Sequence, residues 1–146
     1  MAFRFRFEQL LHYRRHLLER VEQDFGRALE KVRKVQSEVD RIESQKKLCQ
    51  DLLYEKQCEG LPAVEHELLV KNLYGLELKA RQTRKRLEEA IKEMEEQRER
   101  LIEAKKRLEM LEILKRQEVQ EYRRDQTKKE QKLADEIAVQ KTVKEP

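Results

Sequence analysis

The side chains that most often carry out chemistry are few in this chain and widely separated. The histidines are His12, His16 and His66. His12 and His16 lie four residues apart and would share one face of a helix, a spacing that zinc ligands often use. Structural and catalytic zinc sites need at least a third protein ligand, and the topology argued below from the apolar pattern places His66 far from this pair. We predict no metal site.

The cysteines and the glycine content also argue against catalysis. Cys49 and Cys58 lie nine positions apart, and on one helix this separation is a rise of about 13.5 Å, too far for a disulfide. We expect two reduced thiols. With only 3 glycines, the chain has no phosphate-binding loop, and no nucleophile stands beside an oriented base. The sequence predicts a protein that is not an enzyme and binds no cofactor.

The composition favours long helices instead of a globular core. Of the 146 residues, 44% are charged, against about 25% in an average soluble domain. No apolar run approaches the roughly 20 residues of a membrane span, and the residues after Met1 lack the apolar stretch of a secretory signal. We expect a cytoplasmic protein that does not insert into the membrane.

A strict apolar repeat predicts where the helices lie. From Phe7 to Leu53 an alternation of four and three residues gives fourteen positions, of which twelve are apolar. A second repeat runs from Leu69 to Leu111. A period of 3.5 residues held over many heptads indicates a coiled coil, because each such residue keeps facing the partner helix. The residues expected to form this seam include Leu11, Leu18, Val21, Phe25, Val32, Val39, Ile42, Leu73, Leu76, Leu87, Met94, Leu101, Leu108 and Leu111.

The two repeats are separated by one break, at Gly60 and Pro62. Glycine supplies conformational freedom there, and proline disfavours helix at the residue before it. A fold-back at about residue 61 pairs residues whose numbers add up to about 122, so Phe7 should face the neighbourhood of Lys115. We therefore predict an all-α fold, a long antiparallel two-helix coiled-coil hairpin, over a dimer of kinked helices.

The expected boundaries give one coiled-coil domain over residues 1–146. Its first helix covers about 8–58, the bend about 59–63 and the second helix about 64–138, followed by a frayed C-terminal tail. The second helix is the longer, and about 25 of its residues overhang the first. With few apolar residues, this overhang is suited to meeting a partner.

Apolar residues outside the seam mark two candidate docking surfaces. Near the bend, an expected surface either docks a partner or packs around the bend itself; its residues are Leu48, Leu52, Tyr54, Tyr74 and Leu78. At the other end, Phe3, Phe5 and Phe7 alternate with Arg4 and Arg6. These phenylalanines either fold onto the second helix near Leu114 and Tyr122 or remain exposed for a partner.

Motifs at both ends of the sequence resemble one known family. The opening residues 3–7, FRFRF, with Leu10, Leu11, Tyr13 and Arg14, and the closing segments 121–124, EYRR, and 130–138, EQKLADEIA, resemble the flagellar export protein FliJ. The resemblance covers nearly the whole chain and includes its length, its single break and its overhanging second helix. It implies a component of the flagellar type III export apparatus, needed for motility and similar in shape to the central shaft of rotary ATPases.

The resemblance also implies partners. The open end of the hairpin would meet the hexameric flagellar export ATPase, and the bend would meet the cytoplasmic domain of the membrane export gate at the inner face of the cell membrane. It further implies contact with export chaperones, for which no residues stand out. The candidate ATPase-binding residues are Phe3, Arg4, Phe5, Arg6, Tyr122, Lys132, Asp135 and Glu136, and the candidate gate-binding residues are those near the bend.

Two alternatives remain open from sequence. One is the equivalent stalk of a virulence type III secretion system, which would look much the same at the level of residues. The other is a coiled-coil nucleic-acid binder, for which the basic clusters at 84–86 and 105–107 would supply phosphate contacts. Glutamates close to both clusters favour ion pairs on a solvated helix face, so we expect no nucleic-acid partner.

Overall fold

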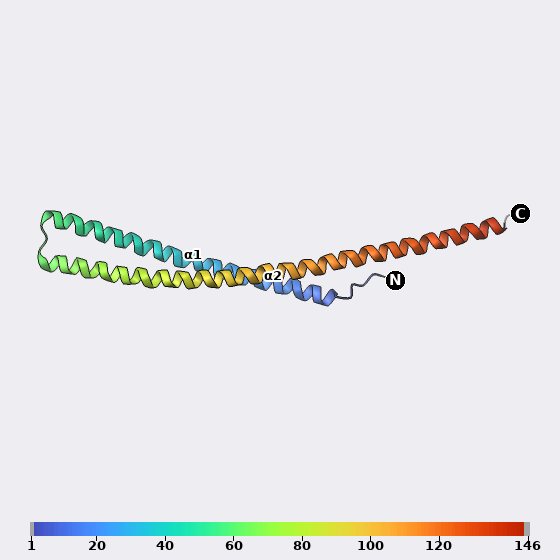
Figure 1. Ribbon diagram of the computed structural model, residues 1–146, viewed down its shortest axis with the longest axis horizontal. Coiled ribbons are helices and arrows are strands. Elements are labelled where there is room, and N and C mark those ends of the chain that lie inside the picture. The colour runs from blue at the N-terminus through green and yellow to red at the C-terminus, as the bar shows by residue number, and fades with distance from the viewer. Residues whose placement is uncertain (1, 145–146) are drawn as a thin grey trace. The chain divides into compact units, whose positions relative to one another are not determined.

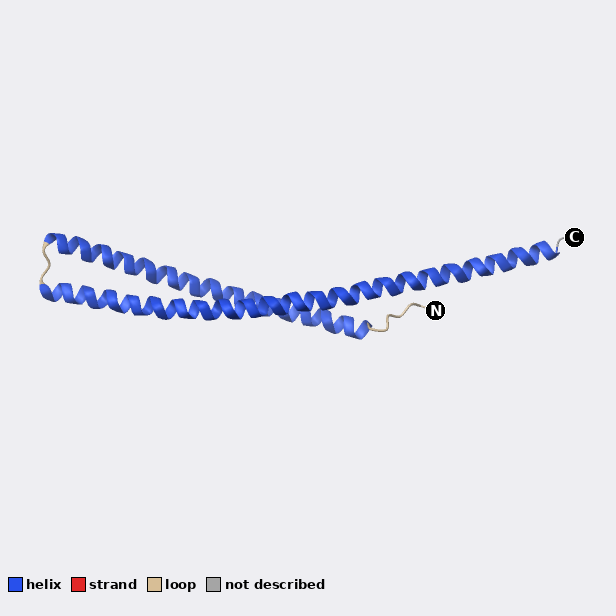
Figure 2. Ribbon diagram, in the orientation of Figure 1, coloured by secondary structure: helices blue, strands red, loops and turns tan. Residues whose placement is uncertain are grey.

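The computed structural model describes residues 2–144, and within them the chain forms two α-helices (Figures 1 and 2). Helix α1 spans Glu8–Glu59 and helix α2 spans Ala63–Lys144. The two are joined by Gly60, Leu61 and Pro62. Gly60 has a φ of +91°, a left-handed conformation that glycine adopts without a steric penalty. The helices pack against each other, which confirms the all-α hairpin predicted from the sequence.

Helix α2 continues six residues beyond the end expected at about residue 138. Of those six residues, Gln140, Lys141 and Lys144 have good helix propensity, and none of the six is a glycine or proline that would stop the helix. A search for apolar periodicity cannot find such a helix, because no seam residues mark it. The last two residues of the expected frayed tail lie outside the described residues.

Contacts divide the chain into two compact units, each containing part of both helices. Unit 2 comprises residues 20–101, and the described part of unit 1 comprises residues 2–19 and 102–144. In unit 2, α1 and α2 run antiparallel from the bend (Figure 1). Its buried side chains are Ala28, Val35, Val39, Ile42, Cys49, Ala80, Thr83 and Ala90. All of them belong to the two repeats, so the predicted seam is the core of this unit.

Ion pairs beside the seam report the register of unit 2. Lys31 Nζ lies 3.1 Å from Glu93 Oε2, and Arg86 Nη1 lies 3.1 Å from Glu38 Oε2. The numbers of each pair add up to 124 (31 with 93, 86 with 38), close to the 122 expected. Exposed ion pairs contribute only about 0.2–1 kcal/mol each, so the apolar seam supplies most of the stability and these pairs mainly favour one register.

The pairs also define two sides of the hairpin. When the seam residues are assigned to heptad positions a and d, Lys31, Glu93, Glu38 and Arg86 all occupy position g. Arg84 and Glu43, which also form an ion pair, both occupy position e. In an antiparallel coiled coil, g therefore faces g and e faces e. Positions g and c share one side of the hairpin, and positions e and b share the other.

Polar residues within the seam are held in different ways. Thr83 is buried and its hydroxyl donates a hydrogen bond to the Lys79 carbonyl oxygen at 2.7 Å. The Cys49 thiol is buried and lies 3.9 Å from the Leu69 carbonyl oxygen. Gln97 differs, because its Oε1 is buried and has no hydrogen-bond partner within the described residues. Cys58 is an exposed free thiol close to the bend.

Candidate docking surfaces

In unit 1 the N-terminal segment folds onto α2. Phe5 and Leu11 are buried with Leu108 in an apolar cluster, and Phe3, Phe7, Leu18, Leu111 and Leu114 pack around it. The ring of Phe3 lies against that of Tyr122, with centroids 5.5 Å apart. This arrangement confirms the expectation that the phenylalanines fold onto the second helix near Leu114 and Tyr122. We call residues 2–7 with their α2 contacts the clasp.

Local hydrogen bonds fix how the clasp enters α1. The Glu8 amide donates to the Phe5 carbonyl oxygen at 3.2 Å, and the Leu11 amide donates to the Phe7 carbonyl oxygen at 2.9 Å. The first bond employs one of the amide groups that a helix N-terminus leaves unpaired, and the second is the first i→i−4 bond of α1. The Phe5 and Phe7 rings meet edge to face with centroids 5.9 Å apart. The alternation of phenylalanine and arginine therefore places aromatic rings inward and cations outward.

Charged pairs extend the seam of unit 1 beyond its last apolar residue. Lys115 Nζ lies 3.0 Å from Glu8 Oε2, and Glu118 Oε1 lies 4.0 Å from Arg6 Nη2. Lys115, Glu118 and Tyr122 continue the alternation of four and three residues after Leu111. Lys115 faces Glu8, one residue from the expected Phe7. An apolar search ends at Leu111 because the side chains that follow are polar, yet the pairing continues as far as Phe3.

The clasp changes which candidate ATPase-binding residues are accessible. Phe5 is buried, so in this conformation it supports the clasp and presents no surface to a partner. Phe3 is half-buried against Tyr122, which is itself half-buried and engaged in contacts. Arg4 and Arg6 are exposed. The accessible chemistry of the N-terminal segment is therefore cationic.

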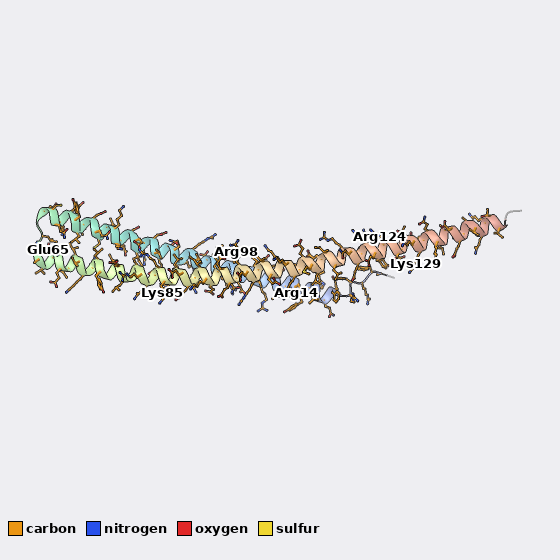
Figure 3. The ribbon with its side chains drawn as sticks, viewed as in Figure 1. Arg14, Glu65, Lys85, Arg98, Arg124 and Lys129 are labelled. Carbon is orange, nitrogen blue, oxygen red and sulfur yellow. The ribbon has the colours of Figure 1, made fainter. Side chains whose placement is uncertain are left out.

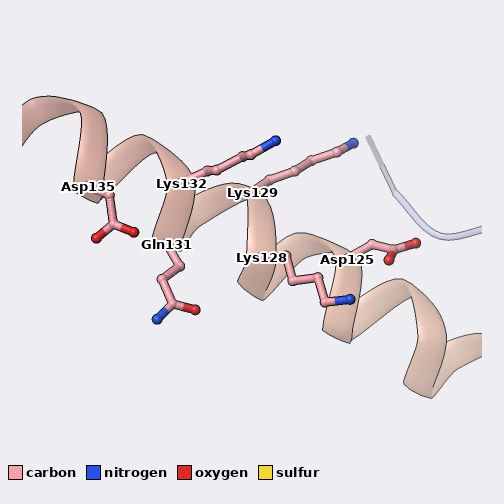
Figure 4. A pocket seen from close by; sticks show the side chains of 6 residues that line it. All are labelled: Asp125, Lys128, Lys129, Gln131, Lys132 and Asp135. Carbon is pink, nitrogen blue, oxygen red and sulfur yellow. The ribbon is translucent and has the colours of Figure 1, made fainter.

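The remaining candidates, Lys132, Asp135 and Glu136, are exposed on the last part of α2. Lys132 and Asp135 line a shallow groove together with Asp125, Lys128, Lys129 and Gln131. In Figure 4, Lys129 and Lys132 extend to one side of the helix, whereas Gln131 and Asp135 extend to another. The apolar Leu133, Ile137 and Val139 are also exposed along this stretch. This segment offers a partner both charge and apolar surface.

In unit 2, every candidate residue near the bend is exposed: Leu48, Leu52, Tyr54, Tyr74 and Leu78. They do not pack around the bend, so of the two interpretations left open, a surface available for docking is the one consistent with their exposure. Heptad positions divide them. Leu48 and Leu52 occupy c and g on one side, Tyr54 and Tyr74 occupy b on the other, and Leu78 lies on the outer surface at f.

Two residues that were not expected from the sequence complete these patches. Leu68 occupies position c, on the side of Leu48 and Leu52, and Val70 occupies position e, on the side of Tyr54 and Tyr74; both are exposed. Heptad assignment combined with the hairpin register would have found them. We call Tyr54, Val70 and Tyr74 the tyrosine patch, and Leu48, Leu52 and Leu68 the leucine patch.

Charged side chains occur along both helices; those labelled in Figure 3 include Glu65 and Lys85 in unit 2 and Arg124 and Lys129 in unit 1. His12 and His16, the pair considered for zinc, each contact a glutamate: His12 Nε2 lies 3.5 Å from Glu8, and His16 Nδ1 lies 4.0 Å from Glu19. Across residues 2–144, no cluster of three or more His, Cys, Asp or Glu side chains could hold a metal ion. No helix in the described part of the chain has the length and apolarity to span a membrane.

These residues define an antiparallel coiled-coil hairpin protein with exposed polar and apolar surfaces in both of its units. A family model described as the flagellar FliJ protein matches residues 3–145, nearly the whole chain. The chain therefore belongs to the FliJ family and is a component of the flagellar export apparatus. Comparison with curated proteins found no match, and comparison with solved structures found none either.

Proposed function

We propose that this protein couples the hexameric flagellar export ATPase to the cytoplasmic domain of the membrane export gate, without catalysing a reaction itself. The observation that supports the proposal is the presence of two chemically different surfaces, one in each unit of the chain. The end of α2 with the exposed arginines of the N-terminal segment is strongly charged. The tyrosine patch is largely apolar. A protein that binds two unlike partners needs two such unlike surfaces.

The charged surface is suited to a ring of ATPase subunits. Residues 123–144 extend about 33 Å at 1.5 Å per residue, and both faces of this helix are accessible. Lys132, Asp135 and Glu136 place both charge signs within about one turn. The helix can therefore form exposed ion pairs with successive subunits, and each such pair is weak enough to be broken and re-formed. Arg4 and Arg6 add cations from the N-terminal segment. Tyr122, Phe3 and Phe5 hold the segment that carries these two arginines against α2.

The tyrosine patch is suited to the export gate. Tyrosine combines a large apolar ring with a hydroxyl group, and exposed tyrosines are common anchors of protein interfaces. Tyr74 is 65% exposed, and Gly75 beside it offers no side chain that would obstruct an approaching surface. In this proposal the protein acts in the cytoplasm and associates peripherally with the membrane at the flagellar base. Export chaperones are further proposed partners.

Two matched sets of variants test these assignments. For the ATPase, Lys132→Glu should weaken binding in a pull-down or calorimetric titration, whereas Lys92→Glu, an equally exposed lysine in unit 2, should not. Equal effects would mean that only net charge matters and would contradict a site at the end of α2.

For the gate, Tyr74→Ala should reduce binding at least tenfold if Tyr74 is an interface anchor. Tyr54→Ala should reduce it to a smaller extent. Leu48→Ala lies on the other side of the hairpin and serves as the control. Loss of binding by Leu48→Ala, with Tyr74→Ala unchanged, would assign the gate to the leucine patch instead.

A further inference from the structure

An apolar face of unit 1 extends beyond the seam and the clasp, shares only Leu114 with the clasp cluster, and has none of the proposed partners assigned to it. It consists of Leu10, Tyr13 and Leu17 of α1 and Met110, Ile113 and Leu114 of α2, and we call it the lateral face. Met110 is 69% exposed and Tyr13 is 58% exposed. Three of these residues, Met110, Ile113 and Leu114, line a groove on α2 together with Leu111 and Gln117. Exposed residues of this size rarely gather without a partner.

Heptad positions place these side chains on one side of the hairpin. Leu10, Leu17 and Leu114 occupy position g, Tyr13 and Met110 occupy c, and Ile113 occupies the neighbouring position f. Leu10 and Leu114 are level with each other, since their numbers add up to 124, as for Lys31 and Glu93 in unit 2. An ion pair flanks the seam at that g–g contact in unit 2. In unit 1, Leu10 and Leu114 take the place of that g–g ion pair. On the opposite side of the hairpin, the e–e contact is still an ion pair, between Arg15 and Glu112.

The charges along α2 around this face are self-complementary. In order, positions c, f and g of α2 carry Glu103, Lys106, Arg107, Met110, Gln117, Glu121 and Arg124. Within one chain Arg107 already pairs with Glu103 at 2.9 Å. If a second α2 runs antiparallel and is centred between Ile113 and Leu114, Lys106 faces Glu121 of that copy. Glu103 then faces Arg124, and Met110 faces Gln117. A parallel second copy in the same register would instead oppose identical charges.

We propose that the lateral face binds a second copy of this chain, through a two-fold axis that passes beside Ile113 and Leu114. A symmetric contact must be complementary to itself, which the order of charges along α2 satisfies and which a contact with an unrelated protein would not require. The axis also passes level with Leu10, so the two Leu10 side chains meet. All neighbouring helices are then antiparallel, the common arrangement in four-helix bundles. The proposal is independent of the export role.

Sedimentation velocity and light scattering of the full chain at low salt test the proposal directly. Because the face is small, we expect dimers with a micromolar dissociation constant, so the mass should rise from 17.8 kDa toward twice that value between about 1 µM and about 500 µM. A mass of 17.8 kDa across the whole range would overturn the proposal and leave the face to a different protein.

A variant in the centre of the face locates the contact. Met110→Glu places two carboxylates in the interface and should raise the dissociation constant more than tenfold. The chain should still fold, because Met110 is exposed and glutamate has good helix propensity; circular dichroism checks this. Leu133→Glu, another exposed position of α2, is the matched control. A dimer that persists in Met110→Glu and is lost in Leu133→Glu would assign the contact to another part of α2.

Charge reversal tests the antiparallel register. Lys106→Glu opposes two acids, and Glu121→Lys opposes two bases, so each variant should dissociate about two to ten times more readily. When the two variants are mixed, both pairs become attractive in the heterodimer, and association should return to the unmodified level. The double variant should also recover. If the mixture associates no better than either variant alone, the proposed pairing is wrong.

Discussion

Replacing Leu11 with alanine tests whether the clasp and the seam of unit 1 form one packed core. Leu11 has 0% of its surface exposed, and the substitution removes three carbon atoms from the apolar cluster. At ~0.8 kcal/mol for each buried CH₂ group, the lost transfer free energy is about 2.4 kcal/mol. The cavity left among Phe5, Leu18 and Leu108 should bring the loss of unfolding free energy to about 3–4 kcal/mol.

Leu10→Ala is a closely matched control. It makes the same change one position earlier in the same helix turn, so the difference in helix propensity cancels. Leu10 is 39% exposed, so less area is lost and solvent fills the gap, which lowers the expected cost to about 1.5 kcal/mol or less. Measurements at low protein concentration keep any self-association from contributing to the result.

Urea unfolding followed by circular dichroism at 222 nm gives the free energies of unfolding. Hydrogen exchange of amides in residues 2–19 shows whether the loss is confined to unit 1. We expect Leu11→Ala to speed exchange there much more than in residues 35–49. Equal destabilisation by Leu10→Ala and Leu11→Ala would refute the argument, because it would mean that the cluster around Phe5 does not pack as described.

Three further substitutions test the backbone conformation of two glycines and the packing of one seam residue. Gly60→Ala should lower the free energy of unfolding by about 1 kcal/mol, because Gly60 has a φ of +91°, which strains an L-residue. Gly26→Ala should raise it by about 0.5–1 kcal/mol, since Gly26 is helical and its added Cβ meets no atom within 4 Å; urea titrations of both variants would show opposite shifts, and shifts of the same sign would contradict this account. Gln97→Leu should raise the unfolding temperature, because the buried Gln97 Oε1 has no partner in the described structure and its removal recovers about 1–3 kcal/mol of desolvation cost. A lower unfolding temperature would indicate that Gln97 is hydrogen-bonded in solution.

The helical hairpin could be predicted because its signals are local and repeated. The alternation from Phe7 to Leu53 fixes one face of α1, and the break at Gly60 with the equal repeat after Leu69 fixes the register. Lys115 lies opposite Glu8, within one residue of the prediction. Such arithmetic works for a hairpin with a short loop, since the loop leaves little freedom to slide and a shift of less than one heptad takes seam side chains out of the holes on the partner helix.

The candidate surfaces were harder to predict, because exposure depends on the partner helix as well as on the sequence. Phe5 and Arg6 are adjacent, yet one is buried and the other exposed, and only the fold of residues 2–7 onto α2 decides which. The residues near the bend were grouped by proximity in sequence. Their separation into a tyrosine patch and a leucine patch follows from heptad positions, which become meaningful only when the antiparallel pairing is known.

The nearly constant sum of paired residue numbers has a consequence for the order in which this chain folds. Gln57 and His66, hydrogen-bonded at 2.9 Å, are separated by nine residues, whereas Phe3 and Tyr122 are separated by 119. The entropic cost of closing a loop grows with its length, so contacts next to Gly60 should form first and later ones should add outward from them. During synthesis the phenylalanines of the clasp are made well before the α2 residues that cover them, and they are the last to be covered. We expect the nascent chain to be most prone to aggregate while these phenylalanines are still uncovered.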